Sequence, residues 1–338
     1  MSVRNWSGAL VGIFQYGTLG ALLLAPVVAS DYWRFFFFQM VVMAYIAVGF
    51  DLSYSYARIL SFMHALFFAL GAYLAVPLVS AAAWSLPAVI VGAALCAGIV
   101  GLVVAAVLVR MDNHNPTIAT VIISSIALLA ANAMPGFTGG DDGLLIGAHT
   151  IGALGMQVAI GPTTSLYYVA VVPLIAIVIA RLALQNSEAW TLVRAVAQNE
   201  IRAQQLGFDA RLRRLVVFAI SAAIAGLGGA FYALMMRHVG TSNLEVGLSI
   251  NAILYAVIGG LGTAIGPLIG VLLIYPVTEV ISLYIVYVPI LVGLILTIVS
   301  LFFSRGIVGS LQKMSEEGAS DSVEPTEEID VPARQLVA

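Results

Sequence analysis

Long apolar runs, broken by short stretches rich in glycine, proline or charge, make up most of this sequence. A helix needs about 20 apolar residues to cross the hydrocarbon core of a bilayer, and the runs have about this length. They lack the alternating segments from which membrane β-barrels are built. The pattern therefore predicts an all-α polytopic membrane protein with about ten transmembrane helices. The expected spans are residues 8–29, 34–55, 59–79, 86–108, 116–134, 165–183, 215–236, 248–264, 266–284 and 286–303.

The first of these runs allows two interpretations. It follows Arg4 and ends in small residues, as a secretory signal peptide does. Its apolar stretch is longer than the about 7 to 15 residues of a signal peptide. Its length favours a span that is retained in the mature protein.

The positions of the cations predict the orientation of the chain. Ten spans that start in the cytoplasm leave only Arg34 and Arg237 outside. An excess of Lys and Arg on the cytoplasmic side is the rule for membrane proteins. We therefore expect both termini to be cytoplasmic. The cations expected inside are Arg4, Arg58, Arg110, Arg181, Arg194, Arg202, Arg211, Arg213, Arg214, Arg305, Lys313 and Arg334.

The composition is that of a membrane protein, and it changes near the C-terminus. The chain is 61% hydrophobic and 9% charged, whereas a soluble domain has about 25% charged residues. After residue 304 the sequence becomes polar and acidic, and such a segment cannot bury enough apolar surface to fold. We expect a transmembrane domain over 1–304 and a disordered acidic cytoplasmic tail over 305–338.

The expected outside loop, residues 135–162, contains no Lys or Arg and eight glycines. One interpretation is a flexible connector between two spans. The other is a lip that contacts an external partner or shapes the outer mouth of a path.

A charged segment, residues 187–214, interrupts the apolar runs and must lie outside the bilayer. Asn199 is a suitable N-cap for a short helix over 200–206, with Glu200 at the positive end of its dipole. Gly207 can end this helix in the left-handed conformation. Ala203 is small enough for a close approach. The segment is either a docking element for another protein or a solvated connector.

Several motifs of this sequence resemble the permease subunits of branched-chain amino acid ABC transporters. The most specific are RAVAQNEIRAQQLGFD at 194–209, FAISAAIAGLGGAFYAL at 218–234 and VIGGLGTAIGPLIGVLL at 257–273. Further similarity lies in ILSFMHALFFALGAYLA at 59–75 and, more faintly, in PTIATVIIS at 116–124 and TGGDDGL at 138–144. The sequence departs from the family's pattern at 61–64 and at 110–116, where a substrate path is expected, so the solute stays open.

The resemblance implies that the segment 187–214 is the coupling element that seats on a cytoplasmic ATPase. The positions that match the family's coupling motif are Arg194, Asn199, Glu200, Ala203 and Gly207.

Small residues recur every fourth position in two series along the expected spans, which lets helices approach closely. The predicted packing positions are Ala222, Gly226, Ala230, Gly262, Gly266 and Gly270.

Polar groups within spans are costly and call for partners or a function. For Asp51 we expect an ion pair with Arg58, a turn or two further along. His64 is either a hydrogen-bonded packing residue or part of a translocation path. The candidate path residues are His64, Asn132, Asn251, Tyr255 and Glu279.

The sequence offers no machinery for chemical catalysis. It contains no GxxxxGK[ST] phosphate-binding loop, and its only lysine is Lys313. We find neither a Cys/His metal cluster nor a nucleophile with its base. The single cysteine, Cys96, lies in an apolar run and is expected to be inert. The sequence predicts no cofactor and no metal, and ATP is expected to bind to partner subunits.

These features predict a transport subunit rather than an enzyme. The resemblance implies the permease of an ABC importer in the bacterial inner membrane, which carries branched-chain amino acids or related small solutes such as urea or amides. The implied partners are a second homologous permease, two cytoplasmic ATPases, an external solute-binding protein and membrane lipid, with no nucleic acid. The alternative is a stand-alone secondary transporter, for which more buried carboxylates would be expected.

Overall fold

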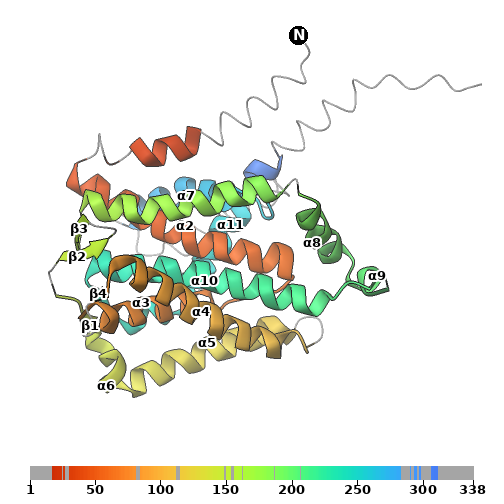
Figure 1. Ribbon diagram of the computed structural model, residues 1–338, viewed down its shortest axis with the longest axis horizontal. Helices are drawn as coiled ribbons and strands as arrows, with labels where there is room; N and C mark the ends of the chain where they lie inside the picture. Colours follow the sequence, from red (N-terminus) through yellow and green to blue (C-terminus); the bar gives the residue numbers. More distant parts are fainter. Residues whose placement is uncertain are drawn as a thin grey trace, which may run out of the picture.

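The computed structural model describes residues 17–24, 26, 30–80, 84–111, 115–147, 150–153, 156–161, 163–185, 187–205, 207–282, 290, 293–294, 297 and 306–310. The described part of the chain is mostly helical (Figure 1). The expected spans 8–29 and 286–303 lie largely outside the described residues.

Each of the other expected spans contains a helix. Five helices are long and apolar enough to cross a membrane: α2 (Asp31–Ala57), α4 (Leu86–Leu108), α5 (Asn115–Ala133), α7 (Thr164–Leu184) and α10 (Ala210–Met236). Three apolar helices are shorter: α3 (His64–Ser80), α11 (Val246–Gly259) and α12 (Gly266–Ser282).

Helix α10 is the centre of the bundle and packs against α2, α3 and α4 (Figure 1). Glycine makes these contacts possible. A Cβ atom on Gly229 would lie 1.8 Å from the carbonyl oxygen of Phe68, and one on Gly71 would lie 2.0 Å from that of Gly226. The backbones of α3 and α10 therefore touch directly, which is how helices gain packing energy in a membrane.

One end of the bundle, called the hairpin end below, carries two small antiparallel strand pairs, of which only β2–β3 is a hairpin. Strand β1 (Leu144–Leu145) pairs with β4 (His238–Val239), and β2 (Thr150–Ala153) pairs with β3 (Met156–Ala159). The short helices α6 (Pro135–Thr138) and η1 (Gly140–Asp142) precede them. The described parts of the loop 135–162 are thus ordered by hydrogen bonds and are more than a flexible connector.

The opposite end of the bundle carries the helices of the charged segment. These are α8 (Glu188–Gln198) and α9 (Glu200–Gln205), which lie beside the end of α2 and the start of α10 (Figure 1).

Helix α11 is too short to cross a bilayer by itself. Its 14 residues rise about 21 Å at 1.5 Å per residue, against a hydrocarbon core of about 30 Å. The chain before it is non-helical or a single 3-10 turn, through β4 and η2 (Thr241–Leu244). The expected span 248–264 therefore ends early, because Gly260 and Gly262 have φ angles of +121° and +76° that break the helix.

Residues 306–310, at the start of the expected tail, are helical. Val308 is 2% exposed. Gly306 lies against Gly260, because an added Cβ would come within 2.4 Å of the Gly260 Cα. Apolar residues at the start of the tail allow this contact. Residues 311–338 lie outside the described part of the chain.

Candidate functional site

Side-chain caps define the helices of the segment 187–214. Ser187 Oγ accepts a hydrogen bond from the Trp190 N–H (3.2 Å) at the start of α8. Asn199 Oδ1 accepts from the Arg202 N–H (3.0 Å) at the start of α9. Gly207, with φ +86°, follows α9 in the left-handed conformation. The structure thus places Asn199 and Gly207 at the two ends of α9, as their residue types predict.

The segment has its own small core and an exposed outer surface. Val196, Ala203 and Ala210 pack together, and Ala203 is 6% exposed. The small side chain of Ala203 therefore faces inward within the segment. Arg194, Asn199 and Arg202 are exposed, and Glu200 is the first residue of α9.

A hollow of about 330 Å³ lies beside the end of α9. The Phe208 ring next to it is 41% exposed. An exposed aromatic side chain beside a hollow is typical of a surface that meets another protein. The residues that line the hollow are Gln204, Gly207, Phe208, Asp209, Ala210 and Arg211.

Several contacts hold α8 against the membrane helices. The Trp190 ring lies 4.6 Å from the Tyr56 ring, centroid to centroid. The Arg213 guanidinium donates to the carbonyl oxygens of Tyr56 and of Val193, and that of Arg214 donates to the Ala57 carbonyl (3.0 Å). The first turn of α10 therefore joins α8 to the end of α2.

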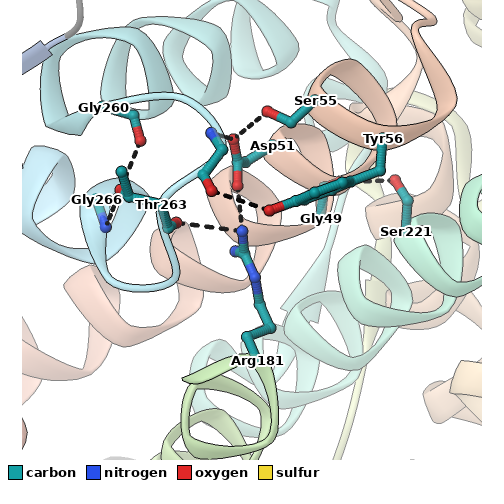
Figure 2. Close-up of polar contacts among 10 residues, drawn as sticks. Gly49, Asp51, Ser55, Tyr56, Arg181, Ser221, Gly260, Thr263 and Gly266 are labelled. Atoms are coloured by element: carbon teal, nitrogen blue, oxygen red, sulfur yellow. Dashed lines mark hydrogen bonds and ion pairs between the residues drawn. The ribbon is translucent and has the colours of Figure 1, made fainter. Parts of the chain in front are cut away.

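The last turns of α2 also hold the loop between α11 and α12 (Figure 2). The Tyr56 hydroxyl donates to the Gly262 carbonyl (2.9 Å), and Asp51 Oδ1 accepts from the Gly262 N–H (2.7 Å). Ser55 Oγ donates to the same carboxylate oxygen (2.8 Å). Side chains of α2 thus bond both the carbonyl and the N–H of Gly262. Its positive φ angle is one that glycine adopts without strain.

Asp51 forms an ion pair with Arg181 of α7, and the prediction of a pair with Arg58 is wrong (Figure 2). Arg58 follows the last residue of α2 in the left-handed conformation and is exposed, so it points away from the buried carboxylate. Asp51 and Arg181 are 0% and 5% exposed, and Arg181 also donates to the Thr263 carbonyl (3.2 Å). A buried charge needs such partners.

His64 lies in the packed interior, between α2, α3 and α10. Its Nε2 is 2.8 Å from Ser221 Oγ, which donates to the Gly49 carbonyl (2.7 Å). The imidazole is fully buried among the rings of Phe50, Phe67 and Phe218. These contacts describe a packing histidine in this conformation.

The structure does not gather the other candidate path residues at one point. Asn132 and Glu279 are exposed near the ends of α5 and α12. Asn251 is exposed on α11, and Tyr255, one turn further, is 4% exposed. The Glu279 carboxylate interacts electrostatically with the Tyr255 phenol, so these two are neighbours.

Most of the predicted packing residues lie at helix contacts. Ala222 and Gly226 face α4, since a Cβ on Gly101 would lie 2.4 Å from the Ala222 Cβ and one on Gly226 would lie 2.4 Å from that of Ala97. Ala230 is fully buried.

The second predicted ridge of small residues is only partly helical. A Cβ on Gly270 would lie 1.8 Å from the Tyr255 carbonyl, and one on Gly266 would lie 2.4 Å from that of Gly260. Gly262 belongs to no ridge: it lies in the loop, where its backbone conformation and not its size matters.

Sequence reasoning missed three functional candidates. Tyr56 and Trp190 were not singled out, although aromatic residues near the ends of spans are a known signal for the membrane surface. Glu245 was not singled out either, and the structure makes it the N-cap of α11. Among the described residues, no group of three or more His, Cys, Asp and Glu side chains could hold a metal ion.

Comparison with known proteins agrees with a role in transport. The family model described as branched-chain amino acid transport system, permease component, matches residues 33–304. No curated protein and no solved structure gives a significant match. The matched range covers the described helices α3 to α12 and most of α2. The chain therefore belongs to the family of permease components of branched-chain amino acid transport systems.

Proposed function

We propose that this chain is the permease subunit of an ABC importer. It forms the translocation path for branched-chain amino acids or related small solutes, and separate cytoplasmic ATPase subunits supply the free energy. The observation that carries the proposal is the continuous series of contacts from the surface helix α8, through Tyr56, to the loop between α11 and α12.

This series of contacts can transmit a movement. A partner that displaces α8 acts on Tyr56 through the Trp190 ring and on Val193 through the Arg213 guanidinium. Tyr56 in turn holds Gly262, which joins two helices of the bundle. A partner that binds the two arrangements of α8 with different affinity thereby shifts the population of two conformations of the path.

The distribution of charge supports a topology of ten spans with both termini in the cytoplasm. In the described part of the chain, Arg34 and Arg237 lie at the hairpin end, where they donate hydrogen bonds to Thr164 and to the Ile146 carbonyl. The cations of α8, α9 and the start of α10 lie at the opposite end. By the positive-inside rule the α8 end is cytoplasmic. In a bacterial inner membrane, the hairpin end then faces an external solute-binding protein.

Two such chains, or this chain and a homologous permease, enclose the path in the proposed assembly. The sequence contains no GxxxxGK[ST] loop, and in the proposed assembly two ATPase subunits seat on α8 and α9. The exposed Phe208 and the hollow beside it offer the contact surface.

The Trp190→Ala variant tests the transmission from α8. It removes the ring that contacts Tyr56 and leaves the caps of α8 and α9 in place. We expect solute uptake by the assembled transporter to fall by about tenfold, because two side chains in contact typically couple by about 0.5–3 kcal/mol. ATP hydrolysis continues, since the ATPase subunits are intact.

The matched control is Trp84→Ala, which removes an exposed tryptophan (47%) before α4, at the other end of the bundle. Uptake by this variant stays near that of the unmodified protein. Equal uptake per ATP hydrolysed in the Trp190→Ala and Trp84→Ala variants would contradict transmission through α8.

A further inference from the structure

Glu245 lies at an unusual depth for a charged residue. The Ala65 N–H donates to Ser249 Oγ (2.9 Å), and the adjacent His64 is linked through Ser221 to Gly49 of α2. Ser249 is therefore level with Gly49, eight residues before Ala57 at the end of α2, or about 12 Å at 1.5 Å per residue.

Helix α11 runs from this level toward the loop held by Asp51 and Tyr56. Glu245 is one helical turn before Ser249 and so lies further from that end, roughly 18 Å from the end of α2. With the membrane surface placed at the end of α2, where the Tyr56 and Trp190 rings meet, this depth is near the middle of a hydrocarbon core of about 30 Å.

The Glu245 side chain is exposed at this depth. Neither ion pair among the described residues includes it, and it makes no hydrogen bond that caps α11. A carboxylate facing lipid at the bilayer centre is strongly unfavourable, so such groups face a water-filled path or a partner. Irregular backbone at membrane depth, such as the 3-10 turn η2 before α11, occurs under the same condition.

The neighbouring residues continue this surface. Ser242, Gly247 and Asn251 are exposed as well. A Cβ added to Gly247 would meet no heavy atom within 4 Å, so the space beside the start of α11 is open. Ile250, 45% exposed, adds an apolar side chain one turn away.

The same turn holds hydrogen-bond donors without acceptors. The amide nitrogen of Asn243 has no partner, although the residue is only 9% exposed. Buried polar groups are normally hydrogen-bonded, and an exception calls for an explanation. The first N–H groups of α11 also point toward the helix start, where the dipole favours an anion.

We propose that residues 241–247 form a binding station for a zwitterionic amino acid in the translocation path. Glu245 binds the ammonium group, and the Asn243 amide and the first N–H groups of α11 bind the carboxylate. This binding station explains why Glu245 is exposed at this depth and why the buried Asn243 amide has no hydrogen-bond partner. The inference rests on the proposed function, and it selects amino acids over neutral amides such as urea.

Uptake measurements with leucine and urea test the station. The transporter is assembled in vesicles with its ATPases, second permease and binding protein. We expect Glu245→Gln to lower kcat/KM for leucine by about tenfold or more, the size expected for a lost charge-assisted hydrogen bond. Glu245→Asp keeps the charge and recovers part of the loss. Asp31→Asn, the same chemical change at an exposed acid at the hairpin end, leaves uptake unchanged.

A labelling experiment tests the location independently of transport rate. The chain has one cysteine, so Glu245→Cys in a Cys96→Ser background carries a single thiol. We expect a water-soluble thiol reagent to modify it, and leucine with the binding protein to slow the modification. Ile99→Cys, at an exposed apolar position of α4, stays unmodified.

The outcomes separate the station from the proposed function. Leucine kinetics of Glu245→Gln equal to those of Asp31→Asn would overturn the station, as would an unreactive thiol at position 245 in an assembly that hydrolyses ATP. ATP-driven uptake of urea but not of leucine would overturn the station and leave the importer standing. Uptake of neither probe with ATP would contradict the proposed function itself.

Discussion

The ion pair between Asp51 and Arg181 is the residue-scale feature that fixes the loop between α11 and α12. Both charges are buried, and each also bonds to the loop backbone. A buried ion pair is weak support for stability by itself, whereas one buried charge without the other is strongly destabilising. The value of this pair lies in the position that it gives to Gly262 and Thr263.

The Arg181→Met variant leaves Asp51 buried without its counter-charge. We expect a loss of about 3–5 kcal/mol, seen as a lower midpoint of thermal unfolding in detergent. The double variant Asp51→Asn with Arg181→Met removes both charges and recovers much of this loss. An Arg181→Met variant as stable as the unmodified protein would mean that Arg181 does not hold the Asp51 carboxylate.

Sequence reasoning succeeded at this scale where the signal was local. Asn199 and Gly207 were placed correctly at the ends of α9, because caps depend on residues within one turn. The partner of Asp51 was wrong, because Arg181 is 130 residues away in the sequence and only the packing of α7 on α2 brings the two together.

At the scale of elements, direct contacts between helix backbones organise the bundle around α10. Gly229 faces the Phe68 carbonyl of α3 so closely that no side chain fits. The spacing of Ala222, Gly226 and Ala230 predicted a ridge of small residues in α10, but this ridge did not include Gly229. It could not predict that Gly262 belongs to a loop, because a glycine that packs and a glycine that turns the chain look alike in a sequence.

The Gly229→Val variant forces α3 and α10 apart, since even the Cβ would lie 1.8 Å from a backbone oxygen that cannot yield. We expect the protein to fail to fold or to unfold at a clearly lower temperature, as overpacking usually costs about 1–3 kcal/mol or more. Size-exclusion chromatography and thermal unfolding in detergent measure this.

Gly92→Ala is the control for Gly229→Val. Its Cβ would meet only the flexible end of Leu78 at 3.3 Å, so we expect a normally folded protein. Equal behaviour of the two variants would contradict direct backbone contact between α3 and α10.

The boundaries of α11 were the least predictable among the described helices. The apolar run 248–264 suggested a complete span, whereas the helix covers only Val246–Gly259 and is preceded by the 3-10 turn η2. Hydropathy measures whether a segment tolerates lipid, and a segment buried inside a bundle passes this test without being a full helix.

At the scale of the whole molecule, the two ends of the bundle differ in charge and in structure. The strands β1 to β4 and few cations lie at the hairpin end, and α8, α9 and many arginines lie at the opposite end. This asymmetry was predictable from the sequence, because positive charge is read directly from it. The attachment of α8 to the core through Tyr56 was not, since it depends on tertiary contacts.

In the proposed importer, this chain conducts solute only when separate ATPases act on it. The most direct measurement is leucine accumulation in vesicles that contain the purified chain alone, or the chain with its partner permease, ATPases and binding protein. We expect leucine to accumulate against a gradient only in the complete assembly and only with ATP. Uphill transport by the chain alone, driven by an ion gradient, would contradict the proposed importer and identify a secondary transporter.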